Sequence, residues 1–116
     1  MIHFPTILPT EILLRRKSRE IADEVLQERY RQNVKFAGST IGEQRHNVLT
    51  WACVLGEESG ESQQAALDIV FGKTPTDFTH LREELVQTAA VAFAMIERID
   101  ARDGALIAPE GTYKNG

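Results

Sequence analysis

The sequence is poor in cysteine and in aromatic residues, and it has no excess of basic charge. Its 116 residues include one cysteine, and only 7% are Phe, Trp or Tyr. A single cysteine cannot form a disulfide within the chain, which excludes a disulfide scaffold and fits a reducing cytoplasm. Thirteen Lys and Arg against seventeen Asp and Glu give a net charge of −4. This charge argues against non-specific nucleic-acid binding, which needs a basic field.

Long hydrophobic runs are also missing. No stretch approaches the ~18 apolar residues that a membrane-spanning helix needs. The first five residues, MIHFP, have no basic region followed by an apolar one, so they do not resemble a secretory signal. We therefore expect a cytoplasmic protein with no membrane and no nucleic-acid partner. The length fits one domain, which we place at residues 1–104, followed by a flexible tail at residues 105–116.

Two long helices are predicted in the first two thirds of the chain. Between Ile12 and Phe36 there is no Gly or Pro, and apolar residues recur at helical spacing, with Thr10 as the expected N-cap. Asn47 is expected to cap a second helix that runs to about Phe71, where a glycine follows.

A third long helix completes the predicted fold. The pattern Thr-Pro-Thr-Asp at residues 74–77 predicts its start, and it continues to about Arg102, with a short helix near Leu106. No β alternation is present, so the fold class is all-α, a bundle of three long helices plus a short C-terminal segment. The apolar run at residues 89–96 predicts a helix buried nearly all round. One chain offers little cover for it, so we expect a homodimer or tetramer that completes the core.

The acidic charge is concentrated in the second half of the chain. Residues 1–50 hold eight basic and six acidic residues (+2), whereas residues 51–116 hold five and eleven (−6). In the second predicted helix, Glu57, Glu58 and Glu61 are neighbours at helical spacing, on the face that carries apolar residues. Like charges at such spacing destabilise an isolated helix, so this cluster needs another explanation.

The third predicted helix repeats the pattern. Glu84 lies on the stripe that carries Leu81 and Val91, and Gln87 follows three residues later. A carboxylate on an apolar stripe is costly unless it is paired or bound to a metal. If the two helices pack antiparallel, their oxygen-bearing side chains converge. The converging residues are Glu58, Glu61, Glu84 and Gln87, with Glu57 adjacent. Oxygen ligands without His or Cys suit Mg²⁺, or Mn²⁺ in its place.

The same residues resemble the signature of a known family. EESGE at residues 57–61, followed by ELVQ at residues 84–87, resembles the EExxE…ExxD motif of MazG-like nucleotide pyrophosphohydrolases. These enzymes belong to the all-α NTP pyrophosphatase superfamily. The flanks WACVLG (51–56), LREELVQTAAV (81–91) and ERYRQNVKF (28–36) look like the core helices of that family.

The resemblance implies a reaction and a set of roles. It implies Mg²⁺-dependent cleavage of the α–β phosphate bond of a nucleoside triphosphate, which gives the monophosphate and pyrophosphate. House-cleaning of non-canonical or deoxy nucleotides is the role it suggests. Glu58, Glu61 and Glu84 would be metal ligands, and Glu57 a ligand or general base, with Glu58 the other candidate base. Gln87 stands where the family usually has Asp, and an amide is a weaker ligand. A non-catalytic relative that binds a nucleotide or a protein therefore stays open.

Several other residues have two interpretations each. Lys35 and Arg82 are candidates to contact a substrate phosphate, or else ordinary surface ion-pairing residues. Trp51 is a core residue or an aromatic that stacks on a base. Cys53 is expected to be a small buried side chain. The basic run at residues 15–19 is a solvated helix face, a phosphate contact or a match for an acidic patch on a partner.

Overall fold

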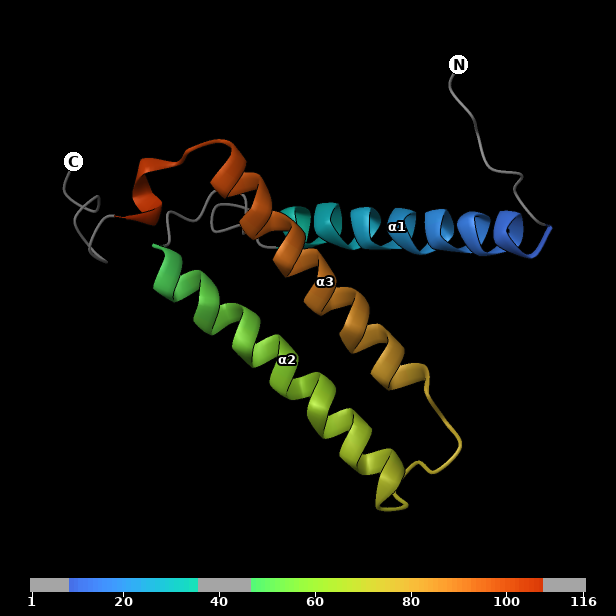
Figure 1. Cartoon of the computed structure of the whole chain (residues 1–116). Coiled ribbons are helices and arrows are strands. Elements are labelled where there is room, and N and C mark those ends of the chain that lie inside the picture. The colour runs from blue at the N-terminus through green and yellow to red at the C-terminus, as the bar shows by residue number, and fades with distance from the viewer. Residues whose placement is uncertain (1–8, 36–46, 108–116) are drawn as a thin grey trace.

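The computed structural model describes residues 9–35 and 47–107, and in these ranges every regular element is helical (Figure 1). Its elements, in chain order, are α1 (Pro9–Lys35), α2 (Val48–Val70), α3 (Thr79–Asp100) and the 3-10 turn η1 (Gly104–Leu106). The all-α fold with three long helices and a short C-terminal element is confirmed. α2 and α3 form an antiparallel hairpin, and α1 crosses α3 (Figure 1).

α1 begins two residues earlier than predicted and extends beyond the hairpin. Thr10, the expected N-cap, lies inside the helix, which starts at Pro9. Proline suits the first turn of a helix because its missing N–H would have no partner there. Every residue of 9–20 is exposed. We call residues 9–20 the arm, and Figure 1 shows it projecting away from the hairpin.

The ends of α2 agree with the prediction. The Asn47 side chain accepts a hydrogen bond from the Thr50 N–H at 2.9 Å, so Asn47 is the N-cap. The helix ends at Val70, and Gly72 follows with φ of 86°. This left-handed conformation is one that glycine adopts without steric cost, which explains why the helix stops here.

The predicted start of α3 is wrong. The helix begins at Thr79, after a loop that contains the Thr-Pro-Thr-Asp pattern of residues 74–77. Pro75 and Asp77 are also strong turn formers. The Asp77 carboxylate accepts a hydrogen bond from the Thr79 N–H at 2.9 Å, two residues on, which ends the turn and precedes the helix. The same residues therefore made a turn where a helix cap was expected.

The core lies between α2 and α3. Its fully buried members are Trp51, Val91 and Ala94, and partly buried side chains pack against them. These partly buried side chains are Val54, Leu55, Met95 and Leu106. Leu106 comes from η1, so the beginning of the predicted tail packs on the core; residues 108–116 of that tail lie outside the described residues.

One burial prediction is wrong. Cys53 is exposed, because it lies on the side of α2 that faces away from α3. The run at residues 89–96 was expected to need cover from a second copy, and in the single chain it is partly open, since Phe93 is 39% exposed and Ile96 57%. α2 covers one face of α3 only, and α1 leaves part of the opposite face open. No helix in the described part of the chain combines the length and the apolar character that crossing a membrane requires.

Candidate functional site

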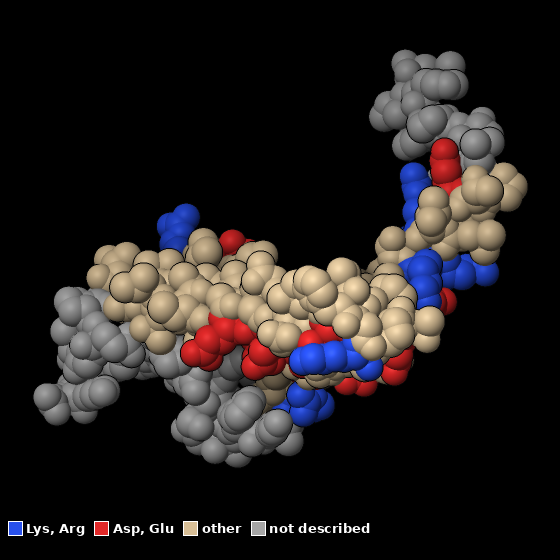
Figure 2. All heavy atoms as spheres, turned by 90° about the horizontal axis from the view of Figure 1, so that it is seen from below, with Lys and Arg blue, Asp and Glu red and all other residues tan. Residues whose placement is uncertain are grey.

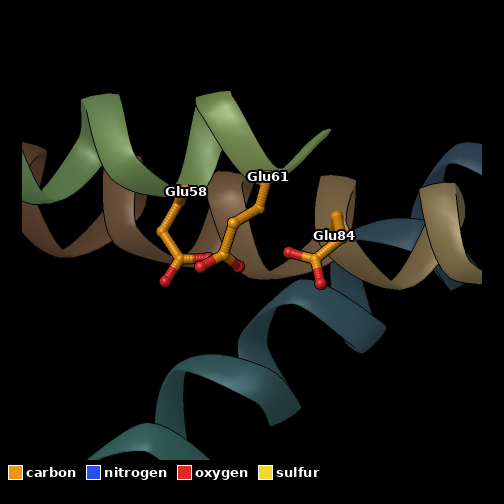
Figure 3. A group of neighbouring side chains, drawn as sticks. All are labelled: Glu58, Glu61 and Glu84. Atoms are coloured by element: carbon orange, nitrogen blue, oxygen red, sulfur yellow. The ribbon is translucent and has the colours of Figure 1, made fainter. Parts of the chain in front are cut away.

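Three carboxylates from two helices meet at one point. Glu58 and Glu61 lie one turn apart on α2, and Glu84 comes from α3 on the opposite side of the hairpin. One carboxylate oxygen of each lies within 4.8 Å of the others. Figure 3 shows the three side chains turned toward one another, on the side of the hairpin where α1 passes.

A hydroxyl contact sets the relative position of the two helices beside this cluster. Ser62 Oγ and Thr88 Oγ1 lie 3.2 Å apart across the α2–α3 interface. Thr88 Oγ1 also donates to the carbonyl oxygen of Glu84 at 2.7 Å, and Ser62 Oγ donates to that of Glu58 at 3.3 Å. Because each hydroxyl has one proton and Thr88 gives its own to Glu84, the bond between the helices forms when Ser62 donates to Thr88 Oγ1 instead of to the Glu58 carbonyl. This contact holds the two helices together beside the carboxylates.

The cluster is electrostatically unfavourable as it stands. Burial raises the pKa of Glu58, and the charges of Glu61, Glu28 and Glu57 raise it further. Burial also raises the pKa of Glu84, followed by its hydrogen bond and charge interaction with Glu61. The Oε2 atoms of Glu58 and Glu84 are buried, and neither has a hydrogen-bond partner among the described residues. Buried carboxylate oxygens in this state favour either protonation or a bound cation.

The spacing of the three oxygens is near that which a single divalent ion needs. Mg²⁺ holds its oxygen ligands at about 2 Å, so two ligands on opposite sides of the ion lie about 4 Å apart. Adjacent ligands of such an ion lie about 3 Å apart, so three oxygens up to 4.8 Å apart would have to move inward to hold it. A basic group, His80, lies beside the cluster, with its Nε2 3.8 Å from Glu84 Oε1 and an exposed side chain. One partly solvated imidazole does not neutralise three carboxylates.

Gln87 and Arg82 line a polar cavity between α1 and α3 to which none of the three cluster carboxylates contributes. The cavity has a volume of about 470 Å³, and Glu28, Gln87 and Arg82 contribute to its wall. Arg82 is already engaged there, because its two terminal nitrogens donate to the Glu24 carboxylate at 2.7 Å each. Gln87 is partly buried. Glu57 is exposed on α2, next to the cluster but not one of the three converging residues.

The remaining predicted contacts lie elsewhere. Trp51 is 1% exposed and fills the core, which leaves its ring no open face for a base to stack on. Lys35 is the last residue of α1, and its side chain is outside the described set.

The sequence interpretation missed the contribution of α1. Glu28 lies close enough to the acidic cluster for its charge to contribute to the raised pKa of Glu58. Its own carboxylate is only 11% exposed and pairs with Arg31 at 2.8 Å. Gln32, one turn later, is 5% exposed, and its Oε1 has no hydrogen-bond partner among the described residues. Residues 27–33 contain no aliphatic residue, so a helix that packs through this segment must bury polar side chains. The lack of aliphatic residues could therefore have indicated buried polar side chains here.

Family models, curated proteins and solved structures were compared with this chain. None matches it. The MazG-like resemblance therefore rests on the two motifs and their flanking stretches.

The raised pKa values predict how stability changes with pH. A carboxyl whose pKa is raised in the native state keeps its proton when the unfolded chain has lost it. The metal-free protein therefore loses stability as pH rises from 4.5, the ordinary value, through the raised pKa values of Glu58 and Glu84. Urea denaturation in EDTA over this range measures the effect.

Other carboxyls act in the opposite direction, so a control is needed. The pKa of Glu24 and that of Asp77 are lowered, by Arg82 and by hydrogen bonds from Thr79. These groups lose stabilisation as pH falls. Comparison with Glu84→Gln separates the two contributions, because the variant should lose less stability than wild type as pH rises. Equal losses in the two proteins would contradict the assignment of Glu84 as a raised, buried acid.

Proposed function

We propose that this protein is a Mg²⁺-dependent nucleoside triphosphate pyrophosphohydrolase, which releases pyrophosphate and a nucleoside monophosphate. The observation that carries the proposal is the convergence of Glu58, Glu61 and Glu84 within 4.8 Å, with buried oxygens that have no described hydrogen-bond partner. The two motifs that resemble MazG-like enzymes support the same assignment, since the three converging residues are all motif residues. Nucleotide house-cleaning is the role that the resemblance suggests.

In this proposal each residue has a defined part. Glu58, Glu61 and Glu84 would hold Mg²⁺, or Mn²⁺ in its place, and such an ion would supply positive charge to offset that of the phosphates and a site for a water molecule. Glu57 is exposed and is not one of the three converging carboxylates, so it would be available to accept the proton of the attacking water. Glu58 is less suited to this task, because it belongs to the converging set. Arg82 contacts phosphate only after it exchanges its pairing with Glu24.

Gln87 supports a second candidate function. It contributes a neutral amide where the family pattern has a carboxylate, so the site has one negative charge fewer. A weaker metal site is consistent with a non-catalytic relative that binds a nucleotide or a protein. The polar cavity that Gln87 lines gives a nucleotide a place to bind in either case.

The setting of the reaction belongs to the same proposal. We propose that the protein works in the cytoplasm as a homodimer or tetramer. The exposed apolar side chains of α3, Phe93 and Ile96 among them, support an oligomer. The single cysteine supports a reducing compartment.

The test is a product assay on the purified chain. It is incubated with a panel of ribo- and deoxynucleoside triphosphates and Mg²⁺, and pyrophosphate and orthophosphate are measured separately. We expect pyrophosphate, in amounts equal to the monophosphate, and none after EDTA. No pyrophosphate from any triphosphate, with Mn²⁺ also tried, would reject the enzyme. Nucleotide binding without turnover would then favour the non-catalytic candidate.

A further inference from the structure

An apolar groove runs between α1 and α3 on the face that α2 does not cover. It consists of two adjoining cavities of about 220 and 340 Å³, and both contain Val25 of α1 and Ala89 of α3. Arg82 is the only charged residue among those that line them. Leu85, Phe93 and their neighbours leave this groove open to solvent in the single chain. An apolar groove of this kind on a small chain marks an interaction surface.

The arm carries a matching stripe. Leu14, Ser18, Ile21 and Val25 are spaced by four, three and four residues, which places them on one side of α1. Leu14 is 67% exposed and Ile21 is 42% exposed. The stripe begins on the projecting arm and ends in the groove, so one end of it has no cover within the chain.

The charges on α1 are divided into two blocks along the helix. Residues 15–19 hold four cations and no acid, and residues 20–28 hold four acids and no cation. Figure 2 shows Lys and Arg gathered on the projecting part of the molecule, while most of the acidic side chains in view lie over the rest. A helix with this division is complementary to a second copy of itself that runs in the opposite direction, because each basic block then meets an acidic one.

We propose that two copies of the chain pair through α1, antiparallel, with the arm of each lying in the α1–α3 groove of the other. In the register that aligns the blocks, Leu14 lies opposite the partner's Val25, and Ser18 lies opposite the partner's Ile21. Lys17 then faces the acidic block that contains the partner's Glu24. The contact is isologous and closes as a dimer. This inference rests on the proposed oligomer, not on the proposed reaction, and it adds the surface and the orientation.

Sedimentation velocity on the full chain tests the pairing. We expect a dimer for wild type and a monomer for Ala89→Glu, because the new carboxylate would be buried in the groove. Ala52→Glu is the matched control, since Ala52 is exposed as Ala89 is but lies on α2, outside the groove. The arm is tested in the same way with Leu14→Glu, and Leu49→Glu on α2 is its control at 69% exposure. Both sites are open in the single chain, and circular dichroism checks that each variant is folded.

The contribution of the two charge blocks of α1 to the pairing is measured separately. The double variant Arg15→Glu/Lys17→Glu should raise the dimer dissociation constant about tenfold or more, and high salt should weaken the wild-type dimer. A wild-type monomer at all concentrations would overturn the proposal. A dimer that survives both Ala89→Glu and Leu14→Glu would also overturn it, as would loss of the dimer in the two α2 controls. Each of these results is independent of whether the protein hydrolyses nucleotides.

Discussion

Replacement of Glu84 by Gln is expected to lower Mg²⁺-dependent pyrophosphate release by about 100-fold or more. Residues that only orient metal ligands commonly contribute about 10- to 100-fold, and Glu84 is proposed as a ligand itself. It is the only one of the three converging carboxylates that comes from α3. Without it, the remaining two lie on one helix and cannot join α2 to α3 through an ion. Steady-state kinetics at saturating nucleotide, over a series of Mg²⁺ concentrations, measures the loss.

The stability of the same variant is expected to change in the opposite direction from its activity. In EDTA, Glu84→Gln should be more stable than wild type, because the amide relieves repulsion from Glu58 and Glu61 without a buried charge. Addition of Mg²⁺ should raise the melting temperature of wild type but not that of the variant. Asp100→Asn is the control, since Asp100 is exposed near the end of α3. Full activity in Glu84→Gln would refute the site, and a variant that is less stable in EDTA would refute the electrostatic argument.

Trp51→Ala is expected to destabilise the fold by about 3–5 kcal/mol, as is usual for a large buried aromatic. Trp51 is one of the two largest fully buried side chains in the described structure, and it packs with Val91 and Ala94. Urea denaturation gives the change in free energy of unfolding. On a domain of this size the loss is a large fraction of the total stability.

The more conservative Trp51→Phe separates the two interpretations of this residue. Phe keeps most of the buried ring, so it should cost less stability and leave the KM for nucleotide unchanged. A rise of KM in a folded Trp51→Phe protein would contradict the core assignment and restore Trp51 as a base-stacking residue.

The sequence predicted the positions of the helices better than it predicted which of their side chains are buried and what they contact. Asn47 and Gly72 each have one dominant local role, so the ends of α2 were readable. Thr74–Asp77 suits a turn as well as a helix start, and tertiary context decided between them. The convergence of the motif acids followed from helical spacing and antiparallel packing. Glu28 was missed because a polar stretch has no hydrophobic period to show which side of the helix is buried.

The exposed part of α3 could not be predicted from the sequence, for a different reason. The apolar run at residues 89–96 predicts burial, but exposure depends on which neighbours arrive. In the single chain α2 and α1 cover only part of that helix. A sequence pattern records what a helix can bury, and it does not say whether the covering element belongs to the same chain.

The acidic cluster also divides the hairpin into two halves of unequal packing. Toward the open ends of the helices lie Trp51, Val91 and Ala94, whereas between residues 63 and 83 only Ala65 is buried. A segment with so few buried side chains opens at a lower free energy than the rest. The distal loop and the turns that flank it therefore form a separate, softer unit of the fold. The carboxylates stand at its boundary, so opening of this unit would separate Glu61 from Glu84 before the core itself opens.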